Sequence, residues 1–240
     1  MKCFRWGRPR ERAESRDCLN RTDVFEGNIM SWSQWIFIGC VGAWAVEAIY
    51  ILRQAAAGLC APDYTIAKGT VGPAVFYSLT GALAPWKKES AKRNLISYGV
   101  GITFHTGIFT SFLWLAVRLA RVNMPGLMIK GAGIFLAVTT LCGLVLLFKR
   151  LSNEVMRKLS YSDDYFSNIM VTILLALAAG DMWNQELESV LFVYAGLVFL
   201  YMPLGKLRHA IYFCLTRIYL GLFYGRRGVW PTGRRTLWQK

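Results

Sequence analysis

The chain has 240 residues, of which 55% are hydrophobic and 18% are charged, with a formal net charge of +14 at pH 7 and a mean hydropathy of +0.34. This composition is too apolar for an ordinary soluble domain of this length. It indicates an all-α integral membrane protein. In such a protein the basic residues are explained by membrane topology, so we expect no nucleic-acid partner.

Residues 1–29 are polar and carry seven Lys/Arg and five Asp/Glu. Met30 directly precedes the first long apolar segment. We therefore expect residues 1–29 to be either a basic N-terminal tail or an upstream extension beyond the true start of the protein.

Five segments are expected to cross the membrane, because a spanning helix needs ~20 predominantly apolar residues at a rise of about 1.5 Å each. The last two are short and are counted because polar loops bound them. The five segments are 33–52, 95–117, 127–148, 165–180 and 187–204. They predict a transmembrane domain over residues 30–224, followed by a basic tail over residues 225–240.

A sixth apolar segment, residues 69–86, is interrupted by Pro73, Pro85 and three glycines. Proline removes a helix hydrogen bond, so we interpret this segment as interfacial or re-entrant. If it does cross the membrane, the chain has six spans and both termini lie inside.

The basic residues are concentrated in alternate loops. Six Lys/Arg lie between the first and second spans, four between the third and fourth, and eight after the fifth, whereas residues 181–188 contain none. Cytoplasmic loops are enriched in Lys and Arg, so five spans place the C-terminus in the cytoplasm.

Only two histidines exist in the chain, His105 inside the second span and His209 just after the fifth. Ionisable residues within membranes are functional candidates by default, and a b haem needs one imidazole from each of two facing helices. Neighbouring Gly101, Gly107 and Gly205 would let a flat macrocycle approach the backbone. The alternative is that each histidine separately bonds a neighbouring helix or a lipid headgroup.

Pairing the two imidazoles requires similar depths in the membrane. His105 lies ~15 Å beyond Leu95 along a helix, whereas His209 follows the end of the fifth span. We expect either that the second span begins below the interface or that the fifth continues through the apolar residues 210–224.

Basic residues flank both candidate ligands: Lys92 and Arg93 open the second span, and Lys206 and Arg208 precede His209. They could neutralise haem propionates; the alternative is that they are ordinary anchors at the cytoplasmic interface.

Glu47 lies deep in the first span, where a lone carboxylate is protonated or paired. It is a candidate proton relay for quinone chemistry or, alternatively, a neutral packing residue. Six scattered cysteines, without a CxxC or CxxCH motif, support neither c-type haem nor an iron–sulfur cluster.

Five stretches carry a resemblance to a known superfamily. They are PWKKESA at 85–91, YGVGITFHTGIF at 98–109, KRL at 149–151 with LSYSDDYFS at 159–167, MPLGKLRH at 202–209 and GRRGVWP at 225–231. The chain resembles the superfamily that contains the gamma subunit of respiratory nitrate reductase and the membrane cytochrome b subunits of heterodisulfide reductase and of the sulfite-reduction-associated Dsr complex. The last two stretches are closest to the Dsr and heterodisulfide branch.

This resemblance implies that residues 30–224 form a transmembrane cytochrome b domain, a haem-binding bundle that serves as the electron-transfer subunit of a membrane oxidoreductase complex. It also implies a location in the cytoplasmic (inner) membrane of a prokaryotic cell. His105 and His209 match the ligands of the haem nearer the cytoplasm. The positions for a second haem fall near Leu115 and Leu191, which cannot ligate iron, so one haem b is expected. The implied partners are quinone or menaquinone, a cytoplasmic iron–sulfur subunit of heterodisulfide-reductase type, other membrane subunits and lipid. The competing hypotheses are a haem-free transporter and a structural anchor.

Overall fold

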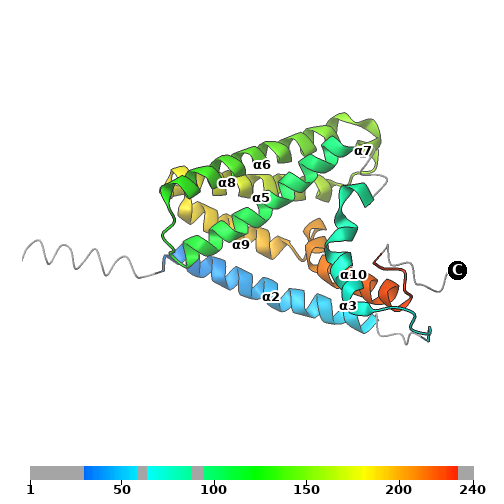
Figure 1. Ribbon diagram of the computed structural model, residues 1–240. Coiled ribbons are helices and arrows are strands. Elements are labelled where there is room, and N and C mark those ends of the chain that lie inside the picture. Colours follow the sequence, from blue (N-terminus) through cyan, green and yellow to red (C-terminus); the bar gives the residue numbers. More distant parts are fainter. Residues whose placement is uncertain (1–29, 59–63, 88–93, 232–240) are drawn as a thin grey trace, which may run out of the picture.

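The computed structural model describes residues 30–58, 64–87 and 94–231. In these ranges every regular element is a helix (Figure 1), which confirms the all-α class. The expected N-terminal tail, residues 1–29, lies outside the described residues, as do Lys92 and Arg93. The α-helices are α2 (Trp32–Gly58), α3 (Val71–Leu79), α5 (Leu95–Leu119), α6 (Gly126–Ser152), α7 (Glu154–Lys158), α8 (Ser162–Trp183), α9 (Glu188–Tyr201) and α10 (His209–Arg226).

Four of these helices are long and apolar enough to cross a membrane: α2, α5, α6 and α8, of 27, 25, 27 and 22 residues. At 1.5 Å per residue each exceeds the ~30 Å hydrocarbon thickness. Their outer faces are apolar as well: on α6, Ile134, Leu141 and Phe148 are 60%, 61% and 71% exposed. These residues recur at seven-residue spacing on one helix face, which suits contact with lipid. The chain is therefore a multi-pass membrane protein.

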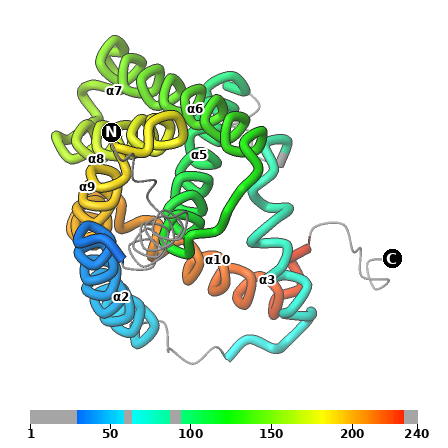
Figure 2. The backbone as a smooth tube through the Cα atoms, turned by 90° about the vertical axis from the view of Figure 1, so that its left-hand side faces the viewer, coloured from blue at the N-terminus to red at the C-terminus, as the bar shows by residue number. Residues whose placement is uncertain are grey.

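The long helices form an open arc. Along it, α2 packs on α9, α9 on α8, α8 on α6, and α6 on α5, while α5 also contacts α8. Figure 2 shows this order in a view along the helices. Where α5, α6, α8 and α9 meet, a buried apolar core includes Leu115, Leu136, Leu174 and Phe192, each no more than 1% exposed. This core holds the inner helices at fixed positions.

The fifth span differs from the expected straight helix. α9 has only 14 residues, about 21 Å at 1.5 Å per residue. The helix ends just before Pro203, which has no N–H to continue the hydrogen-bond ladder. The chain then turns by 78° into the next helical segment, residues 206–226. The expected continuation through residues 210–224 is thus helical, but it does not prolong the span.

Residues 69–86 form the short α3 and the two 3₁₀ turns η1 (Gly81–Leu83) and η2 (Pro85–Lys87). At nine residues, α3 is far too short to cross a membrane, so the described residues contain no sixth span. α3 instead packs against α10. In Figure 1 this pair lies toward the same end of the long helices as α7. A Cβ on Gly221 would lie 2.4 Å from the Cα of Val75, which shows how closely the two backbones approach. An interfacial pair of helices fits this geometry.

The expected boundary between residues 224 and 225 falls inside α10. Gly225 is buried against α3, where a Cβ would meet the Ala74 Cβ at 2.6 Å. Trp230 packs its ring 5.6 Å from that of Tyr77. Residues 225–231 therefore belong to the folded domain.

Candidate functional site

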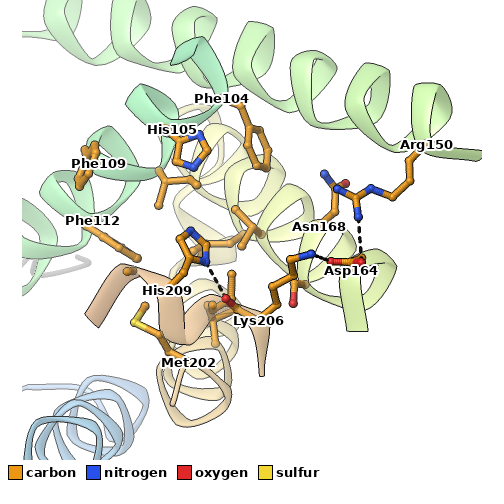
Figure 3. A pocket seen from close by; sticks show the side chains of 17 residues that line it. Phe104, His105, Phe109, Phe112, Arg150, Asp164, Asn168, Met202, Lys206 and His209 are labelled. Carbon is orange, nitrogen blue, oxygen red and sulfur yellow. Dashed lines mark hydrogen bonds and ion pairs between the residues drawn. The ribbon is translucent and has the colours of Figure 1, made fainter. Parts of the chain in front are cut away.

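His105 and His209 line the same cavity, of about 240 Å³, between α5, α8, α9 and α10. Figure 3 shows both rings turned into it. The bend after α9 makes this possible, because it turns the start of α10 toward the cavity that α5 also lines. The sequence interpretation placed the histidines at different depths and offered two ways to reconcile them, a second span that begins below the interface or a longer fifth span. In the structure the fifth span bends by 78° after α9, and both histidines line one cavity.

Each imidazole is held by a backbone carbonyl near it in the chain. The Nδ1 of His105 lies 2.7 Å from the Gly101 oxygen, and the Nδ1 of His209 lies 2.6 Å from the Lys206 oxygen. A carbonyl oxygen can only accept, so Nδ1 must carry the proton in both rings. The lone pair of Nε2 is then available to a metal. This is the arrangement that orients histidine ligands in metalloproteins.

The walls of the cavity are apolar and come from four helices. Leu174 and Val198 form its buried floor, at 0% and 1% exposure. Aromatic rings line the α5 side. The apolar lining residues are Phe104, Ile108, Phe109, Phe112, Val171, Leu174, Val198, Met202, Leu207 and Ala210. Such a lining suits a flat, largely hydrophobic macrocycle.

One end of the cavity is charged. Asp164 is 6% exposed, and its carboxylate forms an ion pair with the Arg150 guanidinium at 3.2 Å, while the Lys206 ammonium forms an ion pair with its other oxygen. Figure 3 shows this cluster beside the histidines. Two cations thus face one buried carboxylate. Lys206 lines the cavity as expected, whereas Arg208 does not.

Sequence reasoning missed Arg150 as a site residue, because Lys149 and Arg150 were interpreted only as loop charges. The signal was its place in KRL, one of the stretches that carry the resemblance. Its proximity to Asp164 depends on how α6 packs on α8, which the spacing of the residues does not reveal.

Glu47 does not lie in the cavity. It is half-buried on α2, which packs on α9 and touches α10. Among the described residues its carboxylate makes no hydrogen bond or ion pair. The structure therefore does not bring the candidate proton relay to the histidines.

Gly101, Gly107 and Gly205 were expected to let a flat macrocycle approach the backbone, but two of them pack against neighbouring side chains instead. A Cβ on Gly107 would lie 2.5 Å from the Thr139 Cβ of α6, and a Cβ on Gly205 would lie 2.2 Å from the Tyr201 hydroxyl. Neighbouring side chains therefore occupy the space where a macrocycle would have to approach. Gly101 alone faces open space, and its carbonyl holds His105.

A second polar cluster, which was not anticipated, lies where α2 and α9 begin and where α5 and α8 end. Asp181, 1% exposed, accepts from the Trp114 indole N–H at 2.8 Å and lies 3.3 Å from the Arg118 Nε. Arg118 also pairs with Glu188, which accepts from the Gln34 amide at 2.9 Å. The cluster joins α2, α5, α8 and α9 by contacts between side chains distant in the sequence.

The positions at which a second haem would be ligated are part of the core. Leu115 and Leu191 are 1% and 0% exposed and pack in the same apolar cluster.

Comparison of the chain with protein-family models, with curated proteins and with solved structures finds no match.

Proposed function

We propose that the chain is the membrane cytochrome b subunit of an oxidoreductase complex, with one haem b held by the Nε2 atoms of His105 and His209. One observation carries this proposal: the only two histidines of the chain line one apolar cavity, each with its Nδ1 tied to a carbonyl. A donor set of two neutral imidazoles from separate helices fits bis-histidine haem ligation.

Haem bound there would supply reversible one-electron transfer. The protein's part is to orient the two imidazoles, to exclude water with the aromatic and aliphatic wall, and to place positive charge at one end. Arg150 and Lys206 supply that charge and are the residues suited to neutralise acidic groups at the edge of the cofactor.

The proposed electron partners are quinone or menaquinone in the membrane and an iron–sulfur subunit of heterodisulfide-reductase type in the cytoplasm. Two segments rich in Lys and Arg adjoin the cavity: residues 149–158, which include the lining residue Arg150, and residues 206–227, which include the lining residue Lys206. Figure 1 shows α7 and α10 toward the same end of the long helices. By the positive-inside rule this end faces the cytoplasm. An acidic partner docking there would come close to the charged mouth of the cavity.

The test is a dithionite-reduced minus oxidised spectrum of the purified chain. We expect a b-type α-band that disappears in His105→Ala and in His209→Ala. Phe109→Leu is the matched control, because Phe109 lies one turn further along the same wall and offers no ligand atom. Well-expressed, intact protein without the band would refute the proposal and favour a haem-free transporter or a structural anchor.

A further inference from the structure

Asp163 connects the start of α8 to the corner between α9 and α10. Its Oδ2 accepts from the backbone N–H of Lys206 at 2.7 Å, and its Oδ1 accepts from the Tyr201 hydroxyl. One carboxylate thus binds the last residue of α9 and the first residue of the 3₁₀ turn η4 (Lys206–Arg208). Asp163 does not itself line the cavity.

Lys206 is held on three sides. Its N–H donates to Asp163, its ammonium pairs with Asp164, and its carbonyl accepts the Nδ1 proton of His209 at 2.6 Å. The carbonyl that orients His209 therefore belongs to a residue that two adjacent carboxylates of α8 keep in place. His105 differs, because its carbonyl partner Gly101 is part of the continuous helix α5 and needs no such support.

The corner between α9 and α10 is tightly packed around the backbone of Gly205. A Cβ on Gly205 would lie 2.2 Å from the Tyr201 hydroxyl and 2.9 Å from the Asp163 Oδ1. The Tyr201 and Asp163 side chains thus rest directly on the backbone that leads into η4. Without the carboxylate, the N–H of Lys206 loses its acceptor, and the residue is held only by the short turn η4, in which its carbonyl accepts from the His209 backbone N–H.

We propose that Asp163 is the positioning residue of His209: its carboxylate fixes the Lys206 backbone, whose carbonyl keeps the imidazole proton on Nδ1 and presents Nε2 to the cavity. The importance of orienting His209 for haem binding rests on the proposed function, since Nε2 is the atom that would ligate haem. The contacts themselves exist without a cofactor, so they can be tested without one.

The presence of only two histidines makes the experiment clean, because His105 serves as the internal control. Protein labelled with ¹⁵N-histidine, in lipid nanodiscs without haem and at a pH where imidazole is neutral, reports the tautomer of each ring. Single His→Ala variants assign the two sets of signals. We expect both rings to carry the proton on Nδ1 in the unmodified chain.

In Asp163→Ala we expect His209 to become a mixture of the two tautomers while His105 is unchanged. Asp163→Asn should preserve the Nδ1 tautomer, because its amide oxygen can still accept from Lys206. Tyr201→Phe, which removes the other contact of Asp163 together with the contact between the Tyr201 and Ser167 hydroxyls, should also preserve it. If Asp163→Ala does not fold, Asp163→Ser, which is polar but too short to reach Lys206, repeats the test.

An unchanged His209 in the folded Asp163→Ala protein would overturn the proposal. So would equal changes in both histidines, because these would show a general loosening of the fold.

A second readout is haem binding by the apoprotein. Loss of a group that orients a metal ligand costs about 10-fold or more in affinity, so Asp163→Ala should bind haem about 10-fold more weakly, and Asp163→Asn about as well as the unmodified chain. If the unmodified chain binds no haem, the proposed function fails, while the tautomers still decide the role of Asp163.

Discussion

The buried cluster around Asp181 yields a quantitative prediction about stability. Asp181→Leu would remove the acceptor for the Trp114 indole N–H and the ion pair with the Arg118 Nε, at 2.8 Å and 3.3 Å. The Asp181 side chain has no exposed surface, so water cannot replace either contact. Leucine would fill the same space without a polar atom.

The expected cost follows from the two contacts. A hydrogen bond between helices in a membrane contributes about 0.6 kcal/mol on average and ~1.7 kcal/mol at most. Breaking a fully buried ion pair costs ~3–5 kcal/mol, but Arg118 keeps Glu188 as a partner and is 19% exposed. The second cost is therefore well below that range, and we expect a total loss of about 2 kcal/mol in the free energy of unfolding.

The assay is unfolding by SDS in mixed micelles, in a double-mutant cycle of Asp181→Leu with Trp114→Phe. The coupling between the two residues should be about 1 kcal/mol, since phenylalanine keeps the ring but loses the N–H. Glu186→Gln, at an exposed carboxylate near the same loop, is the control and should be neutral. A coupling near zero would refute the hydrogen bond as a stabilising contact.

Three further predictions concern other parts of the chain. Arg150→Gln should lower the midpoint potential of the haem, because a nearby positive charge favours the reduced form; a redox titration that shows an unchanged or raised potential contradicts this. Gly221→Leu should separate α10 from α3, since the new Cβ would meet backbone at 2.4 Å, and protease cleavage between residues 204 and 226 should become faster. Glu47→Gln should leave both the haem spectrum and quinol-dependent haem reduction unchanged, because Glu47 does not line the cavity; slower reduction in stopped-flow kinetics would support the proton-relay role instead.

The sequence by itself determined the class of the protein and the positions of its long helices. The expected segments 95–117 and 127–148 correspond to Leu95–Leu119 and Gly126–Ser152. Such agreement arises because the length and apolarity of a spanning helix are local properties, set by the thickness of the membrane. The same local reasoning selected His105 as a candidate ligand, because an ionisable side chain stands out in an apolar segment, and His209 was selected as the only other histidine in the sequence.

Local sequence patterns could not predict the angle at which one helix follows another. Apolar residues continue from α9 into α10, and their composition does not reveal the 78° corner that follows Pro203. That corner brings His209 beside His105 and carries Lys206 to Asp163.

Only the tertiary structure decided which distant residues meet. It paired Arg150 with Asp164 and Asp181 with Trp114, and it turned Gly107 toward Thr139. The physical reason is that each of these contacts depends on the rotation and depth of two packed helices, and neither is encoded in the spacing along one segment.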